Sequence, residues 1–96
     1  MFDWNDMRYF LELQRSGRLL TAAKRLNTTH STVARHIESI EQHLGAALFV
    51  QYAQGYELTP AGQALLKHAE AMENVALLAQ EEINQSLTPL GKIRLG

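Results

Sequence analysis

The chain has 96 residues, of which 46% are hydrophobic and 20% charged, with no cysteine and a formal net charge of -1 at pH 7. A chain of this length forms one small domain with at most an extended arm, and the lack of cysteine excludes disulfides and thiolate zinc sites. Because the sequence has neither a signal peptide nor an apolar run of about 20 residues, we expect a soluble cytoplasmic protein with no membrane anchor.

The charges are unevenly distributed along the chain. Residues 13–37 contain five basic side chains and no acidic one, whereas residues 66–88 contain one lysine and four glutamates. Salt screens charges that are more than about 8–10 Å apart, so the first segment presents a positive field whatever the net charge is. This distribution favours an anionic partner such as nucleic acid.

A first helix is predicted between Asp3 and Gly17. Asp3 is a suitable N-cap, with Asp6 at the third helical position, and Phe2 and Met7 are placed to form a hydrophobic staple. Gly17 supplies the left-handed residue that ends the helix.

A short second helix is predicted over residues 19–26. Its two small residues, Ala22 and Ala23, allow another helix to approach closely. Asn27 then tolerates the left-handed conformation of a tight turn.

A third helix is predicted from its N-cap Thr29 to about Leu44. One side carries apolar residues at helical spacing and is expected to be buried: Val33, Ile37, Ile40 and Leu44. The opposite side of the first two turns is polar and free of acids, and it comprises Ser31, Thr32 and Arg35, flanked by His30, Ala34 and His36. An ordinary three-helix bundle would use the same buried residues but does not predict this polar side.

The segment after Gly45 is typical of a β-hairpin. Its strands are predicted near residues 48–52 and 56–58, around the turn residues Ala53, Gln54 and Gly55.

A long helix is predicted over residues 60–87, because Thr59 and Pro60 are a cap and a first-turn proline and no breaker follows until Pro89. Residues repeat along this helix with heptad spacing and predict a dimer interface: Leu65, Ala69, Met72, Ala76, Ala79 and Ile83. A domain of this size has no internal surface long enough to cover a helix of roughly 42 Å. Pairing with a second copy of the chain is therefore the favoured arrangement.

The second and third helices, joined by a tight turn, predict a helix-turn-helix. The major groove of B-DNA admits one α-helix, and a helix that enters it needs short polar side chains, long donors and no carboxylate near the phosphates. The residues that meet this requirement, and that we expect to contact bases, are His30, Ser31, Thr32, Arg35 and His36.

Three further basic residues, Arg18, Lys24 and Arg25, are expected near the flanking phosphates. Contacts to phosphates add affinity but carry no sequence information. The free N–H groups at the start of the third helix are also suited to face a phosphate.

LysR-type transcriptional regulators have an N-terminal winged helix-turn-helix domain that this sequence resembles over roughly residues 4–87. The resemblance rests on two stretches, TAAKRLNTTHSTVARHIESIEQHLGAALFV and GYELTPAGQALL. It implies a mainly α fold, with a winged helix-turn-helix over residues 1–59, a long dimerising linker helix over 60–87, and a hinge over 88–96 that leads into an effector-binding domain.

The same resemblance implies what the protein does. The third helix, residues 29–44, would lie in the major groove of double-stranded DNA, with the hairpin as a wing on the adjacent minor groove. The protein would bind a pseudo-palindromic site as a homodimer, or as a tetramer at full length, at the bacterial nucleoid. No cofactor is implied for these residues, whereas a small-molecule effector would bind beyond Gly96.

Carried over by position, the residues that fall where the family reads bases or nearby phosphates are His30, Ser31, Ala34 and Arg35, with Thr29 on the cap. His30 stands where glutamine is usual, and Ala34 replaces a frequent serine. In the wing, Gln51 and Gln54 stand beside Gly55 at positions that are usually arginine. An unusual recognition sequence and a weaker wing are therefore expected.

Metal-binding and enzymatic functions find little support in the sequence. No pair among the four histidines has the i, i+4 spacing of a helical zinc site, and no thiolate assists. Ser31 and Thr32 lack a nucleophile elbow and an oxyanion loop, and no phosphate-binding glycine loop is present. The main alternative is a winged-helix dimer that acts as a protein–protein interaction module, which the neutral wing would allow.

Overall fold

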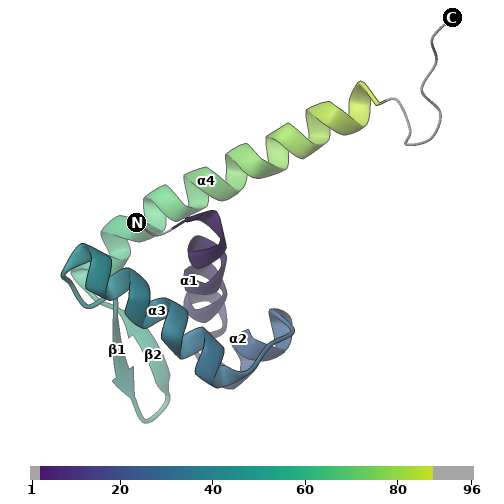
Figure 1. Ribbon diagram of the computed structural model, residues 1–96. Helices are drawn as coiled ribbons and strands as arrows, with labels where there is room; N and C mark the ends of the chain where they lie inside the picture. The colour runs from purple at the N-terminus through teal and green to yellow at the C-terminus, as the bar shows by residue number, and fades with distance from the viewer. Residues whose placement is uncertain (1–2, 88–96) are drawn as a thin grey trace, which may run out of the picture.

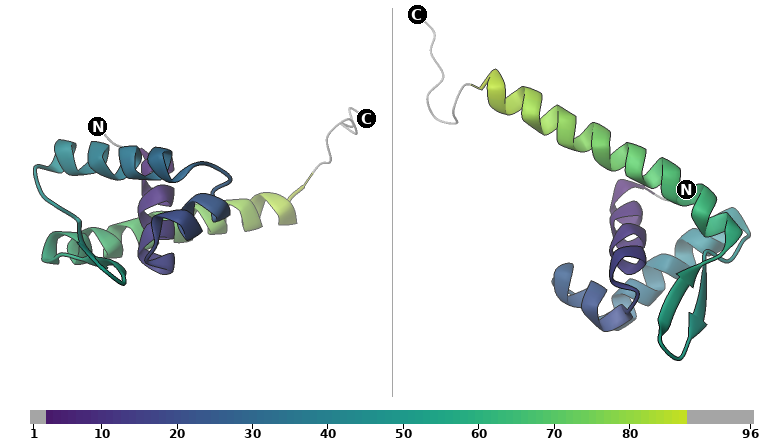
Figure 2. Two further views of the ribbon diagram at one scale, coloured as in Figure 1. Left: turned by 90° about the horizontal axis from the view of Figure 1, so that it is seen from below. Right: turned by 180° about the vertical axis from the view of Figure 1, so that it is seen from behind.

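The computed structural model describes residues 3–87. The predicted Phe2–Met7 staple and the predicted hinge over 88–96 lie outside the described residues. The elements follow in the order α1 (Trp4–Ser16), α2 (Leu19–Arg25), α3 (His30–Leu44), β1 (Phe49–Tyr52), β2 (Gly55–Leu58) and α4 (Pro60–Gln85). Three helices pack together, the hairpin projects beside α3, and α4 runs across α1 and extends beyond the other elements (Figures 1 and 2). This is the winged helix-turn-helix with a long linker helix that the sequence predicts.

The ends of the first helix are fixed by local hydrogen bonds, as predicted. The Asp3 carboxylate accepts from the backbone N–H of Asp6, and the Asp6 carboxylate accepts from the backbone N–H of Asp3, which completes a capping box. At the other end Gly17 has φ 73°, and its N–H donates to the carbonyl of Leu13 over 2.7 Å. Both ends therefore depend on residues within one turn of the helix.

The core lies where α1, α2 and α3 meet. Its largest fully buried side chains are Phe10, Met7, Leu11, Leu13, Ile40, Leu48 and Val33. Ala22 and Ala23 are buried between the helices, which confirms their predicted role at the crossing. The prediction for Leu44 is wrong, because 45% of this residue is exposed. It points in the same direction as Val33 and Ile40, so we infer that the last turn of α3 extends past the elements that cover the rest of the helix.

The two strands pair antiparallel through a two-residue loop, with Phe49 opposite Leu58 and Tyr52 opposite Gly55. The hairpin is held to the end of α1, because the N–H of Tyr56 donates to the carbonyl of Gly17 over 2.8 Å. Gly55 has φ 144°, and a Cβ there would collide with the same carbonyl. The orientation of the hairpin is thus set by contact with the α1–α2 turn.

The last helix begins as predicted, with the Thr59 hydroxyl accepting from the N–H of Gly62 over 3.0 Å and Pro60 in the first turn. It ends at Gln85, two residues before the predicted end. Within residues 3–87, no helix combines the length and the apolar character that crossing a bilayer requires.

The predicted dimer interface on α4 needs correction. Ala69 is fully buried and Leu65 packs against the core, because the first half of the helix lies across the protein's own domain. Beyond that region several large apolar side chains are exposed, and three of them were not part of the heptad prediction: Val75 at 66%, Leu77 at 57% and Leu78 at 55%. The other predicted positions, Met72, Ala76, Ala79 and Ile83, are exposed as well, so their place in a dimer interface stays a prediction.

Candidate nucleic-acid interface

The turn between α2 and α3 is the tight left-handed turn that the sequence predicts. Asn27 has φ 58°, and the N–H of Thr28 donates to the carbonyl of Ala23 over 2.9 Å. Thr29 follows in an extended conformation and caps α3, since its hydroxyl accepts from the N–H of Thr32 over 3.2 Å. The turn and cap together direct the first turns of α3 away from the core.

Two exposed polar side chains lie on the side of α3 that faces away from the core. Ser31 and Arg35 are both exposed and lie one turn apart on the same side of the helix. The guanidinium of Arg35 donates to the Thr32 hydroxyl over 3.3 Å, and the Thr32 hydroxyl also lies 3.0 Å from that of Thr29. Thr32 is half-buried, so it links the cap to Arg35 instead of standing free. The first acid on this helix is Glu38, beyond these two turns.

The structure gives His36 partners within its own chain, and its predicted contact with bases stays a prediction. The imidazole stacks on the ring of Tyr9, with centroids 3.9 Å apart, and its Nδ1 lies 2.8 Å from the Asp6 carboxylate. His36 is half-buried because its position borders the buried stripe of Val33 and Ile37 and faces α1. It joins the recognition helix to α1, and Asp6 serves both this contact and the capping box.

His30 lies on the side of α3 that faces the hairpin. It lines a hollow of about 330 Å³ together with Arg18, Leu20, Tyr52 and other residues of α2 and the wing. The wing candidates Gln51 and Gln54 are exposed, and Gly55 is half-buried at the start of β2. The hollow thus separates the start of the recognition helix from the wing.

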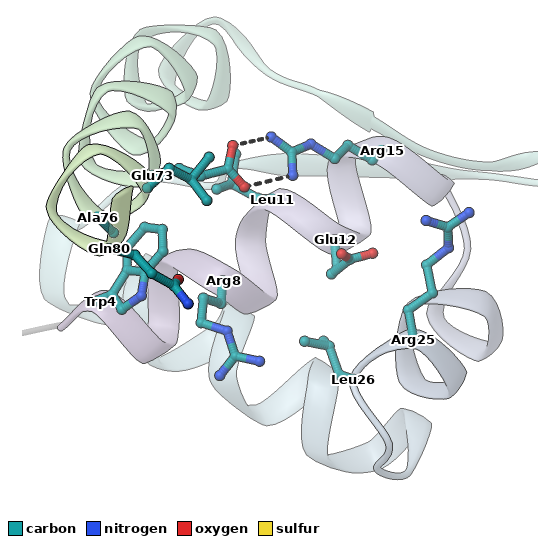
Figure 3. Close-up of a pocket in the computed structure, with 11 residues that line it drawn as sticks. Trp4, Arg8, Leu11, Glu12, Arg15, Arg25, Leu26, Glu73, Ala76 and Gln80 are labelled. Atoms are coloured by element: carbon teal, nitrogen blue, oxygen red, sulfur yellow. Dashed lines mark hydrogen bonds and ion pairs between the residues drawn. The ribbon is translucent and has the colours of Figure 1, made fainter. Parts of the chain in front are cut away.

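The predicted phosphate contacts lie in different places. Arg18 and Lys24 are exposed, and the Arg18 side chain makes no capping hydrogen bond to α2. Arg25 instead lines a pocket between α1 and α4 that also contains Arg15 and Glu73 (Figure 3). Ala34 is half-buried with only a methyl group, so its side chain has no polar atom to offer a phosphate. Arg18 and Lys24 are the better placed of these candidates.

An ion pair in that pocket joins α1 to α4. Arg15 donates through two guanidinium nitrogens to the two carboxylate oxygens of Glu73, over 2.6 and 2.9 Å (Figure 3). These hydrogen bonds lower the pKa of Glu73 and raise that of Arg15. The pair fixes the direction in which α4 leaves the domain, and sequence reasoning missed it because the partners are far apart in the chain.

Among residues 3–87, no three His, Asp or Glu side chains come together in a way that could hold a metal ion. The polar groups on the first two turns of α3 are hydrogen-bond donors and hydroxyls, which suit a nucleic acid better than a cation.

Comparison with known proteins decides the family. Residues 4–63 match the model of the bacterial regulatory helix-turn-helix proteins of the lysR family. The chain belongs to the LysR family. It is 41% identical over 70 residues to the HTH-type transcriptional regulator TfdS of Cupriavidus pinatubonensis, covering 73% of this chain and 24% of TfdS. It is 38% identical over 85 residues to the HTH-type transcriptional regulator HdfR of Yersinia enterocolitica, covering 88% of this chain and 29% of HdfR.

Solved structures of LysR proteins share the fold. The DNA-binding domain of CbnR in complex with DNA is 27% identical, with a TM-score of 0.78 over 88% of this chain and 98% of that chain. The DNA-binding domain of BenM bound to the benA site 1 DNA has the same TM-score at 20% identity, which supports the fold alone. This LysR chain spans about a quarter of the length of the curated relatives it matches.

Proposed function

We propose that this LysR chain binds double-stranded DNA sequence-specifically and regulates transcription, with α3 as the recognition helix. The observation that carries the proposal is the exposed pair Ser31 and Arg35 on the first turns of α3. The first turn of α3 carries no acid, and the turn and cap hold the start of the helix clear of the core. A guanidinium on such a helix is suited to a bidentate contact with guanine O6 and N7.

The likeness to the CbnR domain in complex with DNA supports this proposal. Arg18 and Lys24 would contact phosphates on either side, and the wing would lie at the adjacent minor groove. Because Gln51 and Gln54 carry no charge, the wing would contribute little of the electrostatic affinity. The alternative of a protein-interaction module is not favoured.

A homodimer through α4 is the second part of the proposal. It is supported by the apolar side chains that this helix exposes, including Met72 and Ile83, and by the symmetry that a pseudo-palindromic site requires. This chain spans only part of the length of its relatives. For the full-length protein we propose that it binds a small-molecule effector, forms a tetramer and acts at the nucleoid.

Selection of bound sequences from random duplex DNA, followed by a salt titration on the selected site, tests the DNA proposal. We expect a conserved site with two half-sites. Affinity should fall with salt at a log–log slope of about -0.9 for each phosphate neutralised. No enriched site, or an affinity that stays flat between low and moderate salt, would overturn it.

A further inference from the structure

A cleft lies where α1, the end of α2 and α4 meet, beside the ion pair of Arg15 and Glu73 (Figure 3). We call it the junction cleft. Its volume is about 300 Å³, at the lower end of the range for small-molecule sites. Side chains of all three elements line it, among them Trp4, Arg8, Glu12, Arg25, Leu26 and Leu77. Charged and apolar groups therefore meet in one small space.

Glu12 brings an unpaired carboxylate oxygen into the junction cleft. Its Oε1 is buried, and within residues 3–87 it has no hydrogen-bond partner. The two arginines one turn away on α1 donate to other side chains, Arg15 to Glu73 and Arg8 to Asn5. A buried carboxylate oxygen without a donor is unfavourable, because it has lost water and gained no hydrogen bond in exchange. A ligand with an ammonium group would supply a charged donor.

Arg25 reaches the same cleft from the end of α2 (Figure 3). In the described part of the chain, no nitrogen of its guanidinium lies within 4.0 Å of a carboxylate oxygen, so it does not pair with Glu12. A guanidinium binds a carboxylate through two parallel hydrogen bonds. The space between these two opposite charges therefore fits a ligand that carries both an ammonium and a carboxylate.

Apolar side chains complete the junction cleft. Trp4 and Leu26 are half-buried, and Leu77 is 57% exposed. Leu77 lies about 200° around α4 from Val75, so it does not share the side of the helix that carries Val75. An apolar group of a ligand would cover Leu77 and Trp4 and remove their surface from water.

We propose that the junction cleft binds an α-amino acid with an apolar side chain. Its ammonium group donates to Oε1 of Glu12, and its carboxylate accepts from the guanidinium of Arg25. Its side chain packs against Trp4 and Leu77. Because the bound amino acid contacts α1, α2 and α4 together, it stabilises the direction in which α4 leaves the domain. The site is separate from the side of α3 that we propose contacts DNA.

Titration of this chain with matched ligands tests the proposal, with calorimetry and the fluorescence of Trp4, its only tryptophan, as readouts. L-leucine should bind at one site per chain with a dissociation constant below about 1 mM. Isopentylamine lacks the carboxylate and isocaproate lacks the ammonium, so each should bind at least about tenfold more weakly. L-methionine and L-phenylalanine extend the test to other apolar side chains. If none of these amino acids binds with a dissociation constant below about 5 mM, the proposal is overturned.

Two variants that each remove one charge assign the groups of the ligand to side chains. Glu12→Gln should weaken the binding of L-leucine about tenfold but should not weaken that of isocaproate, which has no ammonium group. Arg25→Gln should likewise weaken L-leucine about tenfold but not isopentylamine, which has no carboxylate. Glu57→Gln and Lys67→Gln, at exposed positions outside the cleft, are the matched controls and should bind L-leucine as the wild type does. Equal losses for L-leucine and isocaproate in Glu12→Gln, or no loss in either variant, would overturn the assignment.

Discussion

At the scale of single residues, α3 divides its polar side chains between two tasks. Ser31 and Arg35 are exposed, although Arg35 donates one hydrogen bond to Thr32, whereas Thr32 and His36 are half-buried and are held by Thr29 and Asp6. The division follows from the position of each residue around the helix relative to the buried stripe. We therefore expect base recognition to depend mainly on the exposed side chains, among which Arg35 is the one long donor in the first two turns.

Replacing Arg35 by alanine should relax the sequence preference at one base pair in each half-site. The loss of a bidentate contact to guanine removes about 1–3 kcal/mol of discrimination. Binding-site selection with the variant measures this directly. Lys24→Ala is the matched control, since it removes a cation without a base contact and should weaken all duplexes about equally. An unchanged preference in Arg35→Ala would contradict the assignment.

Replacing His36 by alanine should destabilise the domain by about 1–2 kcal/mol, because the variant loses both the stack on Tyr9 and the hydrogen bond to Asp6. His36→Gln keeps a donor for the Asp6 carboxylate and should recover part of that loss. Urea denaturation at fixed protein concentration measures both. If alanine left stability unchanged but altered the selected site, the histidine would read bases after all.

At the scale of elements, the wing and the linker helix each pack on the core and each make one defined polar contact with α1 or the turn that follows it. The hairpin is bound at the carbonyl of Gly17, and α4 is bound through the ion pair between Arg15 and Glu73. Both contacts fix directions relative to the recognition helix. In the complex that we propose, the positions of the wing and of the second copy on DNA would follow from these directions.

Gly55→Ala should destabilise the protein by about 1–3 kcal/mol, because its φ of 144° and the carbonyl of Gly17 both exclude a side chain. Gly45→Ala is the control. Gly45 is also left-handed, with φ 68°, but a Cβ there would meet nothing within 4 Å, so only the conformational cost of about 1 kcal/mol remains. Thermal unfolding of the two variants compares them, and equal losses would contradict the role of the contact with Gly17.

The ion pair predicts a dependence of stability on pH. Since hydrogen bonds from Arg15 lower the pKa of Glu73 in the folded state, the stabilisation is present above the unfolded pKa near 4.5 and is lost as pH falls through the lower folded pKa. Both side chains are about a third exposed, so the pair contributes at most about 1 kcal/mol. Glu73→Gln should be less stable than wild type at pH 7 in urea denaturation, and the difference should shrink as the pH falls below about 4.5. A constant difference across that range would exclude the ion pair as the cause.

At the scale of the whole molecule, α4 has two roles. Its first half belongs to the domain of its own chain, and its second half is the surface through which we propose that two copies of the chain associate. Its first half is covered by the core, as the burial of Ala69 shows, and its second half extends beyond the other elements (Figure 1). This arrangement places a partner away from α3. DNA binding and dimerisation can therefore be altered separately by mutation.

Met72→Glu should give monomers in sedimentation velocity, because it places a charge among the apolar side chains that the second half of α4 exposes. Gln63→Glu, at an exposed position near the start of α4, is the control and should remain dimeric. The far-ultraviolet circular dichroism of both variants should match the wild type. A dimer that persists in Met72→Glu would show that another surface joins the copies.

The features that the sequence by itself determined are those that depend on neighbours within a few residues. The N-cap at Asp3, the left-handed turns at Gly17 and Asn27, and the cap at Thr59 were predicted correctly, since backbone sterics and local hydrogen bonds decide them. Periodicity likewise predicted the buried stripe of α3 except at its last turn.

Only the tertiary structure decided which polar and apolar side chains remain free. His36 is engaged by Asp6, 30 residues away, and Arg15 by Glu73, 58 residues away. Ala69 belongs to the core because α4 crosses α1, which no repeat along α4 reveals. Periodicity gives the direction of a side chain around its own helix, but the element that lies in that direction is set by the packing of the whole chain.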